Sequence, residues 1–365
     1  MLAWATEAAG RTPSTATESR AITSSTLCAS GLSPRATSAR RSWREYESRR
    51  GVSQMSMDRR SFLTKAAVAA GAAGMAVGGR GQEPLGTGGE LNAYQFGATT
   101  WVRTGPTPLL AYRAHPTQKY PYLYPFIGPA TGLPVTTESS EPWPHHRSIL
   151  FACDGVNDAN YWQGGVEGGQ IVSRGASIVE SSADVVVIED SVDWMHPSGA
   201  VDIVDERRFT VTAPSSGLRL LEAEIRVWAF RDVHIRQTNH SLFSLRAMPD
   251  LAPQWGGNLM DSEGRRGEGE TFGQRANWCA YWNERHGATE GVALLDHPDN
   301  PWSPCTWFTR DYGFISPTPM QWLGEAGMDV VEGESWHLRY LVVAFAGTPE
   351  EAGLAGLHQT WSGAQ

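Results

Sequence analysis

The feature that most constrains the fold is a succession of short, strand-like runs. From Gln95 onwards, runs rich in Val, Ile, Leu and aromatic residues alternate with clusters of turn-forming residues. Between Arg219 and Phe230 apolar and polar residues alternate with a period of two, which places the apolar side chains on one face of a strand. The runs that predict strands are Ile149–Ala152, Gln170–Val179, Asp184–Glu189, Arg207–Ala213, Arg219–Phe230, Ser241–Arg246, Gly291–Asp296, Thr306–Arg310 and Trp336–Phe345.

This many strands in residues 93–362 predicts an all-β domain, a large two-sheet antiparallel sandwich. A concave sheet face in such a fold suits a sugar, as in the galactose-mutarotase-like supersandwich, which we take as an analogy of fold. One helix is expected near the end of the chain. Thr348, Pro349 and Glu351 form an N-cap, a first-turn proline and a capping-box acid, which predict a short helix over residues 349–360.

The beginning of the chain has the pattern of an export signal. Arg59 and Arg60, a Phe-Leu step and a short run of small apolar residues are typical of a twin-arginine signal peptide over residues 57–79. A buried helix of small residues is the alternative, which its four glycines weaken. Residues 1–56 are interpreted as a non-native or disordered extension and residues 80–92 as a linker. The protein is therefore expected in the periplasm or outside the cell.

Charge narrows the classes of partner. Residues 81–365 carry 18 Lys or Arg against 34 Asp or Glu, and this acidic balance argues against nucleic acid and against an anionic membrane surface. No run after the leader is apolar and long enough to span a membrane. The thirteen tryptophans that follow the leader offer flat faces that stack on sugars, although filling a core is the alternative use. We expect a small-molecule or saccharide ligand.

The first candidate site lies in an aromatic and proline-rich stretch before the strand at Ile149. His145 and His146 are candidate acid/base groups or metal ligands, and Arg147 is a candidate for binding a carboxylate or hydroxyl group. In an extended backbone the two histidines would point to opposite faces, so that only one would join a given site. The alternative is a pair of hydrogen-bonded histidines that fix the loop. Trp162 closes the stretch and is a candidate sugar platform.

Two later segments supply further candidates. Arg275 could clamp a polar ligand against Trp278, or the two could be a surface arginine and a core tryptophan. His297 ends a predicted strand and is a second acid/base candidate. Arg310 and Asp311 could hold a substrate or simply pair with each other.

Three cysteines follow the leader, and their spacing does not match a zinc site. One disulfide and one free thiol are compatible with this number. Export in a folded state hints at a cofactor, whose identity the sequence leaves unknown. The cysteines are Cys153, Cys279 and Cys305.

Several motifs resemble, in order, the secreted bacterial PmoA-like family, also labelled "methane oxygenase PmoA", whose function is unknown. They are Tyr-Pro-Tyr-Leu-Tyr-Pro from Tyr120, Gly-Leu-Pro-Val-Thr from Gly132, Pro-His-His-Arg-Ser from Pro144 and the pair Tyr161-Trp162. The resemblance covers roughly residues 95–318.

The resemblance also bears on metal binding. Family members often carry further histidines at the positions held here by Trp143 and Cys153, so a family-type metal site would lose two ligands and we assign no metal ligands. The family name read literally implies a membrane oxygenase, which the lack of spans excludes.

Together these patterns predict an exported carbohydrate-active protein, a hydrolase, lyase or epimerase, acting in a cleft lined by His, Arg and Trp. Within it, His145, His146 and His297 would serve as acid/base groups. A non-catalytic saccharide-binding module and a soluble metal-dependent oxygenase are the alternatives.

Overall fold

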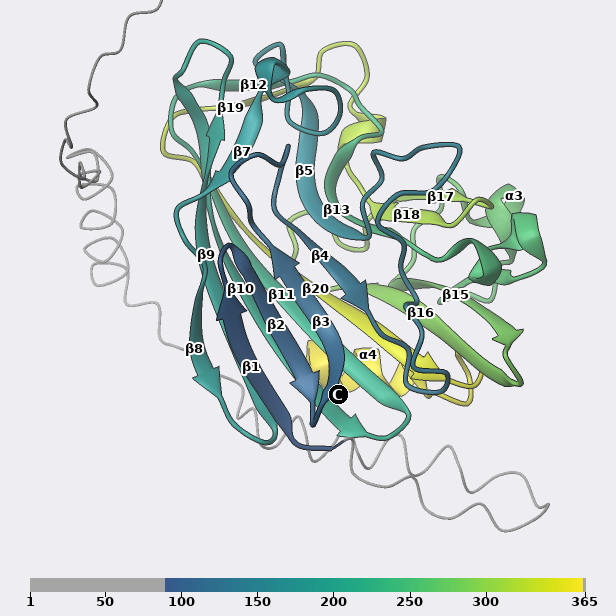
Figure 1. The fold of residues 1–365 in the computed structure, drawn as a ribbon. Helices are drawn as coiled ribbons and strands as arrows, with labels where there is room; N and C mark the ends of the chain where they lie inside the picture. The colour runs from purple at the N-terminus through teal and green to yellow at the C-terminus, as the bar shows by residue number, and fades with distance from the viewer. Residues whose placement is uncertain (1–88, 364–365) are drawn as a thin grey trace, which may run out of the picture. The chain divides into compact units, whose positions relative to one another are not determined.

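The computed structural model describes residues 89–363, and this part of the chain folds into two packed antiparallel β-sheets (Figure 1). The all-β prediction is thus confirmed. The predicted extension 1–56, the signal peptide 57–79 and most of the predicted linker lie outside the described residues. The first strand begins at Leu91.

The first sheet has eleven strands, joined in the order β1-β2-β3-β4-β5-β13-β18-β17, with β6, β12 and β19 attached near β5. Its strands are β1 (Leu91–Phe96), β2 (Thr99–Thr104), β3 (Thr107–Arg113), β4 (Tyr122–Phe126), β5 (Ile149–Val156), β6 (Ala159–Asn160), β12 (Val233–Ile235), β13 (Ser241–Arg246), β17 (Trp307–Arg310), β18 (Phe314–Pro317) and β19 (Met328–Val330).

The second sheet has nine strands in the order β14-β15-β16-β20-β11-β10-β9-β7, with β8 paired to β9. Its strands are β7 (Gln170–Ser173), β8 (Ser177–Ser181), β9 (Val185–Met195), β10 (Val201–Ser215), β11 (Leu218–Ala229), β14 (Asn258–Asp261), β15 (Trp278–Arg285), β16 (Ala288–Asp296) and β20 (Ser335–Ala346). Short helical segments are η1 (Val166–Gly168), η2 (Pro249–Leu251), η3 (Pro253–Trp255), α3 (Gly267–Thr271) and η4 (Met320–Trp322).

Most predicted strands are present, with shifted ends. The predicted run 170–179 is an exception, because it divides into β7 and β8. Gly175 lies between them with a φ of 116°, a backbone conformation that glycine adopts without strain. The alternation in β11 is confirmed, since Ala223, Ile225 and Val227 are buried and the intervening side chains are partly exposed.

Aromatic contacts join the two sheets. Phe243 of β13 stacks on Tyr340 of β20 with 4.7 Å between ring centroids, and Tyr112 of β3 meets Phe209 of β10 at 5.1 Å. Such pairs add attraction to the burial of their area. The first pair also shows that the Phe243 side chain of β13 faces the second sheet.

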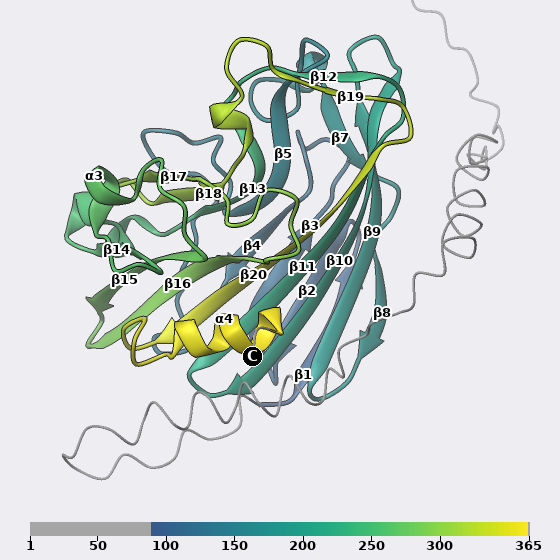
Figure 2. The ribbon, with the colours of Figure 1, turned by 180° about the vertical axis from the view of Figure 1, so that it is seen from behind.

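The C-terminal helix α4 (Leu354–Ser362) covers the other face of the nine-stranded sheet (Figure 2). Leu354, Leu357 and Trp361 pack there against apolar residues of β11, β15, β16 and β20. The predicted capping box forms, because the Thr348 and Glu351 side chains each bond to the other residue's backbone N–H. The predicted start at Pro349 is wrong, however: residues 349–353 form turns that end at Gly353, whose φ is 66°.

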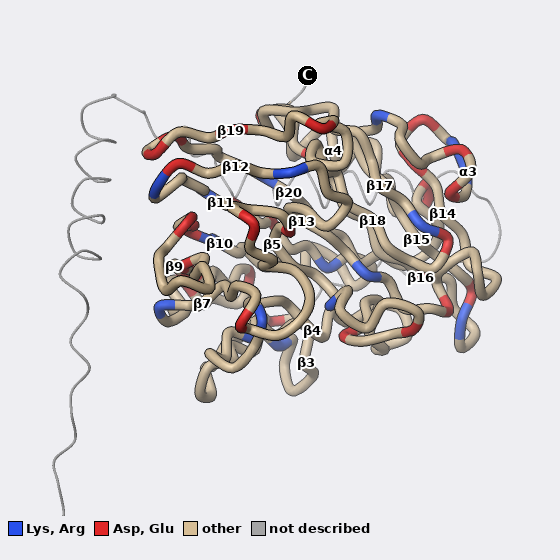
Figure 3. Tube along the Cα trace, turned by 90° about the horizontal axis from the view of Figure 1, so that it is seen from above, with Lys and Arg blue, Asp and Glu red and all other residues tan. Residues whose placement is uncertain are grey.

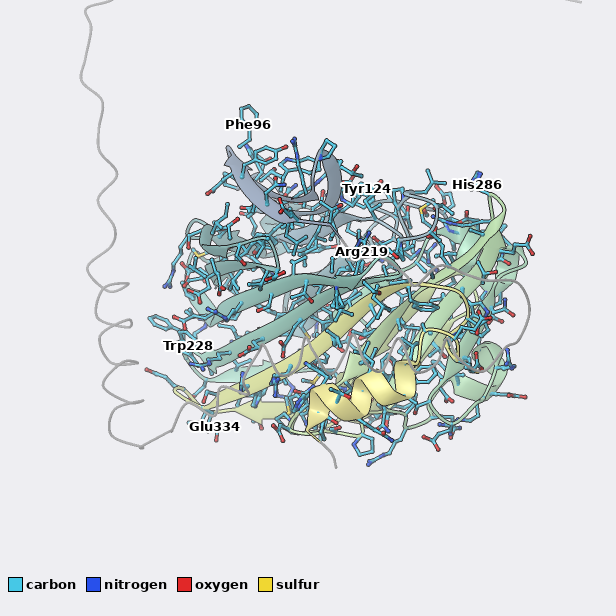
Figure 4. The ribbon with its side chains drawn as sticks, turned by 90° about the horizontal axis from the view of Figure 1, so that it is seen from below. Phe96, Tyr124, Arg219, Trp228, His286 and Glu334 are labelled. Carbon is cyan, nitrogen blue, oxygen red and sulfur yellow. The ribbon has the colours of Figure 1, made fainter. Side chains whose placement is uncertain are left out.

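Charged residues of both signs are dispersed over the described chain (Figure 3). Within residues 89–363 no helix is long and apolar enough to cross a membrane. At the tip of the β1–β2 hairpin Phe96 projects into solvent with 80% of its surface exposed (Figure 4).

Candidate functional site

Three histidines from two distant segments meet beside β5 and β13. The donor nitrogens of His145, His146 and His240 lie within 4.8 Å of one another, and we call these residues the three-histidine cluster. Among the described residues, no other group of three or more His, Cys, Asp or Glu side chains is spaced closely enough to hold a metal ion. Two of the three, His145 and His146, were predicted; His240 was not.

The loop before β5 brings both predicted histidines to one place. The backbone N–H of His146 donates to the carbonyl of Trp143 at 3.1 Å, and the Tyr120 hydroxyl donates to the carbonyl of His145 at 2.7 Å. These bonds hold a turn, and the imidazole rings lie with centroids 4.5 Å apart. The expectation that only one of them joins a site is wrong, because it assumed an extended backbone.

The site lies on the face of the eleven-stranded sheet that points away from the other sheet. Phe243 faces Tyr340 across the core, so Arg246, three residues later on β13, points to the opposite face. Arg246 is paired in register with Phe314 of β18, whose ring lies 4.3 Å from that of His146. Cross-strand partners share a face of a sheet.

Arg246 is fully buried beneath this cluster. Its Nη2 donates to the carbonyl of Glu141 at 2.9 Å, and its guanidinium lies 4.6 Å from the ring centroid of Tyr312. Its Nε and Nη1 have no hydrogen-bond partner. A buried guanidinium with two unused donors is costly unless a ligand accepts from them.

Aromatic faces surround the polar groups. The ring of Trp162 stacks on His240 with 5.5 Å between centroids and 30° between planes, and Tyr312 stacks on His146 at 6.1 Å. Trp143 lies at the rim, 46% exposed and 6.0 Å from His145. Polar groups between aromatic faces match the chemistry of a small-molecule site.

Unpartnered polar atoms concentrate here. Of eleven buried side-chain N or O atoms without a hydrogen-bond partner in the described residues, six belong to His145, His146, Trp162 and Arg246. Buried polar groups in folded proteins are nearly always paired, so a group of exceptions in one place needs an explanation. A polar ligand that enters from solvent supplies one.

The electrostatics keep the imidazoles of His145 and His146 neutral. Burial, then the neighbouring His145, His240 and Arg246, lower the pKa of His146 to about 2. Burial, then His240 and Arg246, lower the pKa of His145 to about 4. At neutral pH both rings can accept a hydrogen bond or ligate a cation, while neither holds a proton to donate as an acid.

His297 lies apart from this cluster. Its Nε2 is 2.8 Å from Nη1 of Arg339 on β20, and its ring meets the Trp361 ring of α4 at 4.7 Å. Burial and Arg339 lower its pKa to about 4. These contacts place His297 under α4, on the far face of the nine-stranded sheet.

Three other predicted ligand-binding residues make structural contacts. The guanidinium of Arg147 lies 5.3 Å from the ring centroid of Tyr122. Arg310 pairs with Glu268 at 2.7 Å, so the predicted pairing of Arg310 with Asp311 is wrong. Asp311 instead accepts the backbone N–H of Glu268 at 2.8 Å, at the start of α3.

Arg275 lies in a cleft that does not include the three-histidine cluster. It lines a cleft of about 330 Å³ together with Trp302, Ser303 and Trp322, between the β16–β17 loop and η4. The expected clamp with Trp278 does not form. Trp278 belongs to the buried cluster beneath α4, which is the core alternative considered for it.

All three described cysteines are buried free thiols, and no disulfide joins them. Burial raises the pKa of each thiol, which keeps it protonated. Cys153, Cys279 and Cys305 therefore have a packing role here.

The sequence reasoning missed His240 and Arg246. His240 directly precedes the predicted strand Ser241–Arg246, and Arg246 is its last residue. One signal was available, because the predicted pair His145-His146 also lies just before a strand. The pairing of β13 with β5 brings the two loops together, with the N–H of Asp154 bonded to the carbonyl of His240 at 2.8 Å.

Comparison with solved structures finds sandwich proteins at low similarity. A candidate aldose 1-epimerase from Escherichia coli K12 is 11% identical with a TM-score of 0.30, over 70% of this chain and 98% of that one. A GalM/aldose epimerase homologue from Caenorhabditis elegans is 8% identical with a TM-score of 0.30, over 71% and 96%. A heparinase III is 9% identical with a TM-score of 0.30, over 74% of this chain and 36% of that one. These values carry no argument about the chemistry of the site.

No curated protein matches the chain. One family model does match, over residues 99–359, which include both sheets from β2 onwards and all the residues of the three-histidine cluster. The chain belongs to the family of unknown function DUF6807.

Proposed function

We propose that the protein is an exported protein that binds a saccharide at the three-histidine cluster and acts on it. The observation that carries the proposal is the set of six buried, unpartnered nitrogen atoms on His145, His146, Trp162 and Arg246. A sugar offers several hydroxyl groups that both donate and accept, and its apolar faces stack on aromatic rings. Trp143 and Tyr312 provide such faces beside the polar atoms.

The roles follow from charge and exposure. Arg246 carries the fixed positive charge and would bind a carboxylate or a developing oxyanion through Nε and Nη1. His145 is partly exposed and its pKa, about 4, is the higher of the predicted pair. It is therefore the better placed to take a proton from a sugar hydroxyl, and His146 would accept a hydrogen bond.

A non-catalytic saccharide-binding module is the second candidate. The low pKa values of His145 and His146 favour it, because a weak base transfers protons with little driving force at neutral pH. The soluble metal-dependent oxygenase stays an alternative, and the twin-arginine export stays a prediction.

The experiment follows the anomeric proton signals of a panel of mono- and oligosaccharides, uronic acids included, by NMR with and without the purified protein. Faster exchange of anomers, or new anomeric signals from cleavage, would establish an enzyme. Line broadening alone would support the binding module. No change across the panel would contradict a saccharide function.

A further inference from the structure

The three-histidine cluster also fits a cation. We propose that His145, His146 and His240 bind one divalent first-row transition-metal ion of the zinc class, with a fourth position open to a ligand. This inference does not rest on the saccharide proposal, because metal uptake is measured without a sugar. When the ion is bound, His145 and His146 ligate it, so the acceptor roles proposed above belong to the metal-free protein.

The three imidazole rings form a donor set that suits a transition-metal ion. Imidazole nitrogen suits Zn²⁺, Cu²⁺, Ni²⁺ and Fe²⁺, and three histidines with one open position are a known arrangement of catalytic zinc. In this structure His145 Nε2 and both ring nitrogens of His146 are buried and bonded to nothing. A ring nitrogen that has no hydrogen-bond partner can offer its lone pair to a metal ion.

The spacing carries the second step. Metal–nitrogen bonds of about 2.1 Å in a tetrahedral site place the nitrogens about 3.4 Å apart. The upper limit of 4.8 Å between donor atoms here requires the rings to close by small rotations. His145 and His240 are partly exposed, which leaves room for such rotations and a path for the ion.

A carboxylate lies behind one ligand. Oδ2 of Asp154 is 3.7 Å from Nδ1 of His240, so a small rotation of the ring would bring Nδ1 into hydrogen-bond distance of the carboxylate and leave Nε2 for the ion. Carboxylates that face the second nitrogen of a ligating histidine fix its orientation and strengthen the metal bond. Asp154 is thus a positioning residue in this proposal.

The charge of Arg246 specifies what fills the fourth position. A divalent ion on three neutral rings beside a guanidinium concentrates positive charge in a buried place, which an anion would offset. Nε and Nη1 of Arg246 are free to hold that anion. The open position should therefore take hydroxide or a carboxylate in preference to a neutral ligand.

The test uses purified protein stripped with a chelator and titrated with Zn²⁺ or Co²⁺ alone. We expect about one ion per chain, and the visible absorption of low-coordinate Co²⁺. His240→Ala should weaken binding by more than the roughly 100-fold that loss of an outer hydrogen-bonding partner can cause, and Asp154→Asn by about tenfold. His297→Asn removes a buried histidine outside the cluster and is the matched control, with unchanged uptake.

Stripped wild-type protein that takes up no stoichiometric Zn²⁺ or Co²⁺ would overturn the proposal, as would equal uptake by a folded His240→Ala variant. If that variant does not fold, the imidazole NMR signals of the wild type decide. Zn²⁺ should shift those of His145, His146 and His240 and leave that of His297 in place, whereas a shift confined to other histidines would overturn the site.

Discussion

Two regions of this protein combine a buried histidine, an arginine and a tryptophan, yet they differ in what their polar atoms contact. Under α4, Arg339 donates to His297 and to Glu222, each at 2.8 Å, and Trp361 Nε1 donates to Glu222 at 2.9 Å.

In the three-histidine cluster the corresponding atoms of His146, Arg246 and Trp162 are mostly unpartnered. The same residue types thus form a hydrogen-bonded network under α4 and leave polar atoms free to bind a ligand in the three-histidine cluster. Buried polar groups stabilise a fold only when their partners are present.

The largest expected effect is on ligand affinity, which should depend on Arg246 and not on Arg339. Arg246→Met should weaken saccharide binding by at least about 100-fold, because it removes two charge-assisted hydrogen bonds of roughly 1.5–3 kcal/mol each. The unfolding free energy should change by less than about 1 kcal/mol, because losing the hydrogen bond to Glu141 is offset by no longer burying a guanidinium with unpartnered donors. Isothermal titration and denaturant unfolding measure the two quantities. Unchanged affinity in a folded variant would contradict the assignment.

The corresponding substitution under α4 should lower stability and leave saccharide affinity unchanged. Arg339→Met removes a hydrogen bond to His297 and the ion pair with the partly buried Glu222, which keeps only the Trp361 hydrogen bond. This should lower the unfolding free energy by about 2–3 kcal/mol. Saccharide affinity should equal that of the wild type. Urea unfolding of both methionine variants side by side checks this, and equal loss of stability in the two would remove the distinction between the regions.

The pH dependence of stability sharpens the account of His146. Its pKa is about 2 in the folded protein against an ordinary value of 6.5, so below pH 6.5 the unfolded chain binds a proton that the folded chain does not. The stabilisation is complete above that pH and is lost as the pH falls. From about pH 7 to about pH 5 it should amount to about 2 kcal/mol for this one group.

Urea unfolding at several pH values, compared between wild type and His146→Gln, isolates this contribution. His145, His240 and Arg246 face His146 and remain in both proteins. A difference between the two curves that does not vary with pH would show that His146 is protonated or exposed in the folded protein.

The smallest effect compares the two tryptophans. Trp361→Phe should cost about 1 kcal/mol more in unfolding free energy than Trp162→Phe, because the first loses a hydrogen bond to Glu222 and the second loses none within the protein. Both lose a similar volume of buried indole. Thermal unfolding of the pair measures the difference, and a larger cost at Trp162 would argue that its Nε1 already has a partner.

The sequence predicted the sandwich because its signal is local. In β11 the period-two pattern identified the buried face correctly, although the polar side chain of Glu222 is covered by α4 and is not simply solvent-exposed. The four strands before residue 149 were not delimited, since polar residues and prolines interrupt their apolar runs. The C-terminal helix begins at Leu354 and not at Pro349, because Gly353 adopts a left-handed backbone conformation. That conformation interrupts a helix even where a capping box forms before it.

The site was predicted only in part because it depends on pairing between distant strands. His145, His146 and Trp162 belong to one aromatic stretch that a reader of the sequence can recognise. His240 and Arg246 join them only through the register of β13 with β5 and β18, which one sequence does not disclose. The contacts of His297 could not be predicted for the same reason, since nothing near it in the chain indicated Arg339 or α4.

The three-histidine cluster has unpartnered polar atoms that we expect to bind a ligand. The network around His297 is already hydrogen-bonded within the protein, and we expect it to bind none. The most direct test records the imidazole C–H signals of the wild-type protein by NMR while the saccharide panel is added. We expect shifts at His145, His146 and His240 with at least one sugar, and none at His297. Shifts at His297 alone, or at no histidine with any sugar, would contradict it.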